Sequence, residues 1–285
     1  MIEFLCQALG ALPIDCLKHA FMQQALLGLL LLAPVSAVLG VEVIHFRMAF
    51  FSDAIGHSAF AGVAIGLLLS WEPRLTMLAF GILVGLGIVA LQRRSNISSD
   101  MAIGVVFSAV VAFGLAVVSR SHGTARSMQQ FLFGDILTIG PDELVFLSAL
   151  LPVVFLVQAV GFNSMLLVAL NPVMARAHGV HVALWQYLFA SLLAVVVIFS
   201  VWTVGVLLVT ALLIVPAACA RNVSRSLHGM FWWAIAISLF SAFTGLVLSA
   251  QPWMSTATGA TIILVSCVLF ALSTVSRRCL QGRKG

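Results

Sequence analysis

The sequence has very few charged residues. Lysine and arginine together number 14 and aspartate and glutamate 9, so only 8% of the 285 residues are charged. An average soluble domain is about a quarter charged. Here 62% of the residues are hydrophobic and the mean hydropathy is +1.17, so the charges are too few to cover a water-facing surface. Soluble enzyme folds, nucleic-acid-binding modules and disordered chains are therefore excluded, and the composition indicates an integral membrane protein.

Tyrosine and paired cysteines are also scarce. The chain has one tyrosine against 20 phenylalanines, and its apolar runs are unbroken. A transmembrane barrel would instead alternate apolar and polar residues. The five cysteines form no Cys-x-x-Cys pair, which excludes a zinc-finger site and argues against a disulfide framework. No phosphate-binding P-loop and no HExxH or Gly-x-Ser-x-Gly motif occurs. If the protein pumps, its energy comes from another chain.

The apolar runs predict an all-α, polytopic bundle of transmembrane helices. A helix needs roughly 20 apolar residues to cross the hydrocarbon core, and about nine runs qualify, with eight to ten as the bounds. Residues 1–20 are expected to form an interfacial segment, 21–277 a single transmembrane domain, and 278–285 a basic cytoplasmic tail. Small residues recur four apart in 58–66 and 81–85, which is typical of close helix packing in lipid. The predicted spans are 21–44, 48–70, 75–92, 101–119, 143–160, 185–202, 204–220 (broken or re-entrant at Pro216 in one interpretation), 228–249 and 258–277.

The distribution of basic residues predicts the orientation. Cytoplasmic loops of membrane proteins carry an excess of Lys and Arg. With the N-terminus outside and the C-terminus in the cytoplasm, the inner segments carry ten of the 14 basic residues and the outer segments four. The opposite orientation would invert this ratio.

Two ionisable residues stand out inside an apolar helix. Asp53 is followed four residues later by His57, so both side chains are expected on one helix face. Ionisable residues inside a membrane are costly and are candidates for function. A carboxylate and an imidazole on one face can be two metal ligands, and a symmetric dimer would bring four together. The alternative is that the two side chains pair with each other or cap a neighbouring helix.

Glu42 is a further acid near the end of a predicted helix. We expect a salt bridge with Arg47 there and assign the pair no function.

The segment 161–184 is expected to be a loop that contains a short helix. Asn171 is a suitable N-cap, Pro172 a suitable first helical residue and Gly179 a suitable C-terminal stop. These residues predict a helix over roughly 172–178 on the cytoplasmic side. A short capped helix between two spans could be the contact site for a cytoplasmic motor protein. An ordinary loop between two spans is the alternative.

Several motifs in one order resemble the bacterial ABC-3 family of metal-uptake permeases, over residues 21–276 or so. The similar segments are FRMAFFSDAIGHSAFAGVAIG, SSDMAIGVVFSAVVAFGLAVVS, FLFGDILTIGPDEL, VGVLLVTALLIVPAACAR and TGATIILVSCVLFALS. The family usually has an acid just after the proline of its short helix, where this sequence has Val173 and Met174.

The resemblance implies a membrane permease that is not itself an enzyme and holds no cofactor. It implies a homodimer in the bacterial cytoplasmic membrane, with a cytoplasmic ATP-binding subunit and an extracytoplasmic metal-binding protein as partners. Asp53 and His57 match the family's Asp-x-x-x-His and are implied to bind metal. The short helix, with Asn171, Pro172, Arg176 and Gly179, is implied to contact the ATPase.

The expected cargo is zinc. The aspartate at position 135 is similar to what the zinc members of the family have there. A ligand set of imidazole and carboxylate also suits zinc. The alternatives are a manganese or iron(II) importer of the same family, a permease for a metal–chelate complex, a secondary carrier that does not use ATP, and a membrane scaffold that transports nothing.

Overall fold

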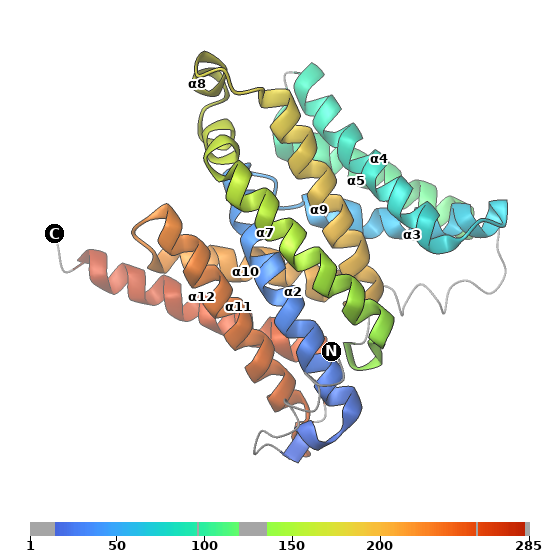
Figure 1. Ribbon diagram of the computed structural model, residues 1–285, viewed down its shortest axis with the longest axis vertical. Coiled ribbons are helices and arrows are strands. Elements are labelled where there is room, and N and C mark those ends of the chain that lie inside the picture. Colours follow the sequence, from blue (N-terminus) through green and yellow to red (C-terminus); the bar gives the residue numbers. More distant parts are fainter. Residues whose placement is uncertain (1–14, 96, 120–135, 255, 283–285) are drawn as a thin grey trace. The chain divides into compact units, whose positions relative to one another are not determined.

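The computed structural model describes residues 15–95, 97–119, 136–254 and 256–282, and these ranges contain helices and no β-strand (Figure 1). The all-α fold expected from the sequence is therefore confirmed. The helices are η1 (Asp15–Lys18), α2 (Ala20–His45), α3 (Phe51–Leu69), α4 (Pro73–Arg94), α5 (Ser99–Val118), η2 (Ile136–Thr138), α7 (Pro141–Leu170), α8 (Pro172–Ala177), α9 (Val182–Val204), α10 (Val206–Val223), α11 (Leu227–Ser249) and α12 (Thr258–Gly282).

Each of the nine predicted spans overlaps one of these helices. In the described ranges, eight helices are long and apolar enough to cross a membrane, namely α2, α4, α5, α7, α9, α10, α11 and α12. The remaining predicted span, 48–70, corresponds to α3, which has 19 residues. The exact number of crossings and the orientation of the termini remain predictions.

One helix end and one expected helix break differ from the structure. The predicted span 143–160 is part of α7, which has 30 residues and continues to Leu170, so the first ten residues of the expected loop 161–184 are helical. Residues 161–170 are apolar apart from Asn163 and Ser164. Gly161 lies so close to the Trp185 ring that a side chain there would clash. The second difference concerns Pro216, which lies inside the continuous helix α10 and does not break it.

The chain forms two compact units, each built from separate stretches of sequence. The first unit comprises residues 1–41, 134–155 and 207–285, and in it α11 packs along α12 (Figure 1). A Cβ atom added at Gly245 of α11 would lie 2.6 Å from the Cα atom of Ile262 on α12, so this glycine permits the close approach. Ser238 of α11 donates a hydrogen bond to the backbone carbonyl of Ala33 at 3.1 Å, which ties α11 to α2.

The second unit comprises residues 42–133 and 156–206. Its centre is α3, which packs against α4, α5 and α9. Gly62 on α3 approaches α4 so closely that an added Cβ atom would lie 2.6 Å from the Cα atom of Met77. Gly81 on α4 makes the same room for Ile198 of α9, where an added Cβ would lie 2.7 Å from the side chain. Small residues at four-residue spacing therefore do bring these helices together.

Candidate functional site

Asp53 and His57 lie in the first half of α3. Asp53 is the third residue of the helix, where a carboxylate interacts favourably with the helix dipole. Among residues 51–60 these two side chains alone are partly exposed, and the other eight residues are buried. The expectation that the two side chains share one face of the helix is therefore confirmed. Their role as metal ligands remains a prediction.

The His57 ring is held in a defined orientation by its own helix. Its Nδ1 atom lies 2.9 Å from the backbone carbonyl oxygen of Asp53. A carbonyl oxygen can only accept, so Nδ1 donates and carries the proton. In the neutral ring the lone pair then belongs to Nε2. Metal-binding histidines commonly donate their other N–H to a backbone carbonyl in this way, so the geometry is that of an imidazole prepared to bind through Nε2.

Two phenylalanines flank the imidazole. The Phe107 ring of α5 meets His57 edge-on, with ring centroids 5.1 Å apart and planes at 82°. Phe60, one turn further along α3, lies 6.0 Å away at 66°. These contacts restrict rotation of the imidazole.

The described residues contain no group of three or more His, Cys, Asp or Glu side chains that could hold a metal ion. Within those ranges, one chain therefore supplies at most two such ligands at Asp53 and His57. Asp135, on which the zinc expectation partly depends, lies outside the described residues. So does His122.

The short helix α8 forms as the sequence predicts. The Asn171 side chain accepts hydrogen bonds from the backbone N–H groups of Val173 and Met174, both at 3.1 Å. Pro172 is the first residue of the helix. Gly179 follows the helix end with φ of 76°, a backbone conformation that favours glycine. The capping predicted for Asn171, Pro172 and Gly179 is confirmed, whereas contact with an ATPase remains a prediction.

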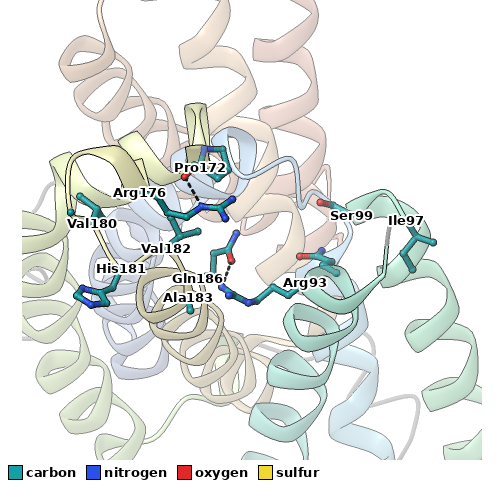
Figure 2. Close-up of a pocket in the computed structure, with 12 residues that line it drawn as sticks. Arg93, Ile97, Ser99, Pro172, Arg176, Val180, His181, Val182, Ala183 and Gln186 are labelled. Atoms are coloured by element: carbon teal, nitrogen blue, oxygen red, sulfur yellow. Dashed lines mark hydrogen bonds between the residues drawn. The ribbon is translucent and has the colours of Figure 1, made fainter. Parts of the chain in front are cut away.

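A pocket of about 790 Å³ lies beside α8, between the end of α4 and the start of α9 (Figure 2). Arg176 projects from α8 into this region, and its Nε donates to the backbone carbonyl of Pro172 at 3.3 Å. From the opposite side, Arg93 of α4 donates to the side chain of Gln186 on α9 at 3.0 Å. The lining residues include no acid; they are Gln92, Arg93, Ile97, Ser99, Pro172, Arg176, Gly179, Val180, His181, Val182, Ala183 and Gln186.

Beneath α8, a small apolar cluster joins three helices. Val168 of α7, Ala175 of α8 and Val182 of α9 are buried together. Phe46 and Trp185 pack against them. The remaining face of α8 is open, since Val173 and Met174 are 71% and 50% exposed. The buried Ala175 therefore connects α8 to α7 and α9.

One polar pair was not predicted. Glu42 of α2 accepts a hydrogen bond from Gln158 of α7 at 2.6 Å, whereas we expected Arg47 to be its partner. Arg47 is exposed in the turn after α2. The sequence signals that Glu42 is unusual, because it is an acid within an apolar helix, but it contains no signal that points to Gln158, 116 residues away.

Comparison with known proteins places the chain in a family. A family model described as the ABC 3 transport family matches residues 18–277. The chain is 31% identical over 253 residues to the high-affinity zinc uptake system membrane protein ZnuB of Haemophilus influenzae, which covers 89% of this chain and 96% of that protein. It is 32% identical over 257 residues to the manganese transport system membrane protein MntC of Halalkalibacterium halodurans, covering 90% and 87%.

A solved structure supports the same relationship. PsaBC from Streptococcus pneumoniae in complex with Fab matches with a TM-score of 0.77 and 26% sequence identity, over 96% of this chain and 95% of that one. The apolar helices and the family match together make the chain a multi-pass membrane protein. Its relatives are transporter membrane subunits and not enzymes. The chain therefore belongs to the ABC 3 transport family.

Proposed function

We propose that the chain is the membrane permease of an ATP-driven importer whose cargo is the divalent zinc ion, and that Asp53 and His57 hold this ion in transit. The observation that carries the proposal is the hydrogen bond from His57 Nδ1 to the Asp53 carbonyl at 2.9 Å. It leaves Nε2 as a ligand on the face that also bears the Asp53 carboxyl group. One oxygen and one nitrogen ligand suit zinc.

Two ligands in each chain are few for a zinc site. A second copy of the chain, related by a two-fold axis, would supply two more and complete a four-ligand shell. We therefore propose that the functional permease is a homodimer with the site at its axis. A shell divided between two subunits opens when they move apart, which is what release of a transported ion requires.

The choice of metal has a clear competitor. Imidazole nitrogen suits zinc, whereas sites richer in carboxylate shift toward manganese. The relatives at similar identity include one named for zinc uptake and one named for manganese transport. The balanced Asp53 and His57 set favours zinc, and a manganese or iron(II) importer is the alternative.

We propose that α8 receives the motion of a cytoplasmic ATP-binding subunit. The exposed Val173 and Met174 offer an apolar contact, and Arg176 with Arg93 gives the adjacent pocket a positive charge. The apolar cluster at Ala175 links α8 to α7 and α9. This contact requires α8 on the cytoplasmic side of a bacterial membrane, which corresponds to an N-terminus outside and a C-terminus in the cytoplasm. An extracytoplasmic binding protein delivers the metal.

The test is ATP-dependent uptake of labelled zinc by the reconstituted complex of the permease with its ATP-binding subunit and binding protein. Wild type is compared with Asp53→Ala and His57→Ala, with and without excess manganese. One exposed acid and one exposed histidine provide the controls, Glu72→Ala and His228→Ala. We expect uptake to be lost in the first two variants and kept in the controls.

Each contrary result removes a specific part of the proposal. Uptake that persists in both Asp53→Ala and His57→Ala would show that the transit site lies elsewhere. Full competition by manganese would overturn the metal assignment and leave the permease function intact. Uptake without ATP would identify a secondary carrier.

A further inference from the structure

A buried acid–amide pair lies apart from the proposed transit site. Glu42 of α2 is fully buried and Gln158 of α7 is 7% exposed. Gln158 Nε2 donates to Glu42 Oε1 at 2.6 Å. Both residues belong to the second unit of the chain, and neither is used by the function proposed above.

The other two oxygens of this pair have no donor. Glu42 Oε2 and Gln158 Oε1 are both buried and have no hydrogen-bond partner. In an ionised carboxylate and in an amide, both of these atoms are acceptors only. An ionised Glu42 would therefore leave two buried acceptors unsatisfied, one of them charged, which is an expensive arrangement inside a protein.

A single proton satisfies both atoms. A carboxylic acid and a primary amide form a ring with two hydrogen bonds, in which the amide N–H donates to the acid carbonyl and the acid O–H donates to the amide carbonyl. The first of these bonds is present between Nε2 and Oε1. The second would join Oε2 to Gln158 Oε1, the two atoms that lack partners. We propose that Glu42 and Gln158 form a proton-binding site, in which Glu42 is a neutral carboxylic acid bonded to Gln158 through this ring.

The charged and titratable groups on the surrounding segments do not supply an alternative donor to Oε2. On α2 the other titratable residue is His45, and Arg47 is exposed in the turn that follows. On α7 the titratable residues are Asp142 and Glu143, both in the first turn and about four turns from Gln158. On α9, which meets α7 at Gly161, the Tyr187 ring contacts Arg93. On α10, which packs against α2 at Gly40, the titratable residues are Cys219, which is buried, and Arg221, which is exposed. Glu42 Oε2 has no hydrogen-bond partner among any of these groups.

The proton has a consequence for transport, and this step rests on the proposed function. Asp53 and His57 lie in the same unit as Glu42. An ionised carboxylate there, with an amide oxygen beside it, would be a second oxygen site for a passing divalent cation. The protonated pair has no charge and directs its oxygens at each other. It therefore links α2 to α7 without retaining the cargo.

Infrared spectroscopy of the full-length permease in lipid nanodiscs at neutral pH tests the proposal. The C=O stretch of a protonated carboxyl group is resolved from the carboxylate bands, and it shifts in D₂O. The difference between wild type and Glu42→Gln should contain one such band, present only in wild type. Asp100→Asn removes an exposed carboxyl group and should remove carboxylate bands without affecting the acid band.

Two further measurements keep the test decisive. Gln158→Leu removes the donor to the acid carbonyl, so the acid band should remain and move to higher frequency. Glu42→Gln restores both bonds as an amide–amide ring and should keep the wild-type melting temperature, whereas Gln158→Leu should lower it.

Loss of carboxylate bands in Glu42→Gln, or an acid band that neither variant alters, would overturn the proposal. Zinc binding that weakens in Glu42→Gln would also overturn it, because the pair would then be a metal site. None of these outcomes depends on transport, so failure of the Asp53 and His57 site would be seen separately.

Discussion

Removal of the cap on α8 should uncouple transport from ATP hydrolysis. Asn171 accepts two backbone N–H groups, both at 3.1 Å. Replacing a capping Asn with Ala typically costs about 1 kcal/mol, within a range of about 0.5–2. Since about 1.4 kcal/mol corresponds to a factor of ten, Asn171→Ala should reduce the ratio of folded to unfolded α8 by about fivefold.

The local cost matters because α8 cannot form alone. It has six residues, and isolated helices shorter than about 12–15 residues are marginal in water. Apart from its cap, α8 is held by the burial of Ala175 against α7 and α9. Without the cap, the helix depends more strongly on this apolar contact. The long helices do not depend on Asn171, so the effect should be confined to α8.

The assay measures three quantities on the reconstituted complex with Asn171→Ala. The initial rate of ATP-driven zinc uptake should fall in proportion to the folded fraction of α8. About fivefold is the upper limit of this fall, because a fivefold lower ratio of folded to unfolded helix lowers the folded fraction by at most fivefold. Zinc affinity, measured by calorimetry, should not change, because Asp53 and His57 lie on α3. ATP hydrolysis by the partner subunit should respond less to the binding protein.

Asn171→Asp is the matched control, because a carboxylate caps equally well and interacts favourably with the helix dipole. It should transport as wild type does. Wild-type uptake in Asn171→Ala would refute the role of α8 as the coupling element. If Asn171→Asp fails as severely as Asn171→Ala, the asparagine does not act through its cap.

Three smaller predictions concern other sites. Gly62→Ala should lower the melting temperature of the purified permease by several degrees, because the added Cβ atom would lie 2.6 Å from a backbone atom of α4. Gly87→Ala is the control and should not lower it, because nothing lies within 4 Å of that position. Equal melting temperatures for the two variants would contradict the close packing. Phe107→Ala should weaken zinc binding severalfold, because it releases the His57 ring. Phe113 lies on the same helix and stacks on Phe80 instead, so Phe113→Ala should leave the zinc affinity measured by calorimetry unchanged. Gly179→Ala should reduce uptake about as much as loss of the Asn171 cap, because φ of 76° strains any residue with a Cβ; full uptake would show that the turn tolerates it.

The positions of the helices were predictable because apolar runs in this chain are long and clearly separated. Helix ends were less predictable. We ended the span at residue 160 because about 20 residues cross the hydrocarbon core, yet α7 has 30 residues and at 1.5 Å per residue is about 45 Å long. Apolar composition continues past the thickness of a bilayer, and composition alone does not distinguish the extra turns from a loop. The cap at Asn171 was the reliable signal for where the helix stops.

The candidate metal site was predictable to the level of a helix face. The spacing of Asp53 and His57 fixes their common side of α3, and their partial exposure among buried neighbours agrees with it. The spacing does not determine what each ring nitrogen binds. We considered a direct pair between the two side chains, whereas His57 Nδ1 donates to the backbone of Asp53. That choice depends on side-chain rotamers and on the Phe107 ring from another helix, which no local pattern contains.

The wrong partner for Glu42 has an instructive cause. A bond to Arg47, five residues on, required the helix to continue far enough to turn Arg47 back toward Glu42. The helix instead ends at His45, and Arg47 takes a left-handed backbone conformation with φ of 55°. Its side chain is exposed at the helix end, where a charged group meets water at least cost. Glu42 then needs a partner at its own depth, and only a polar side chain on a packed neighbour such as Gln158 can be one. For an acid inside a span, helix packing therefore decides the partner more than proximity in sequence does.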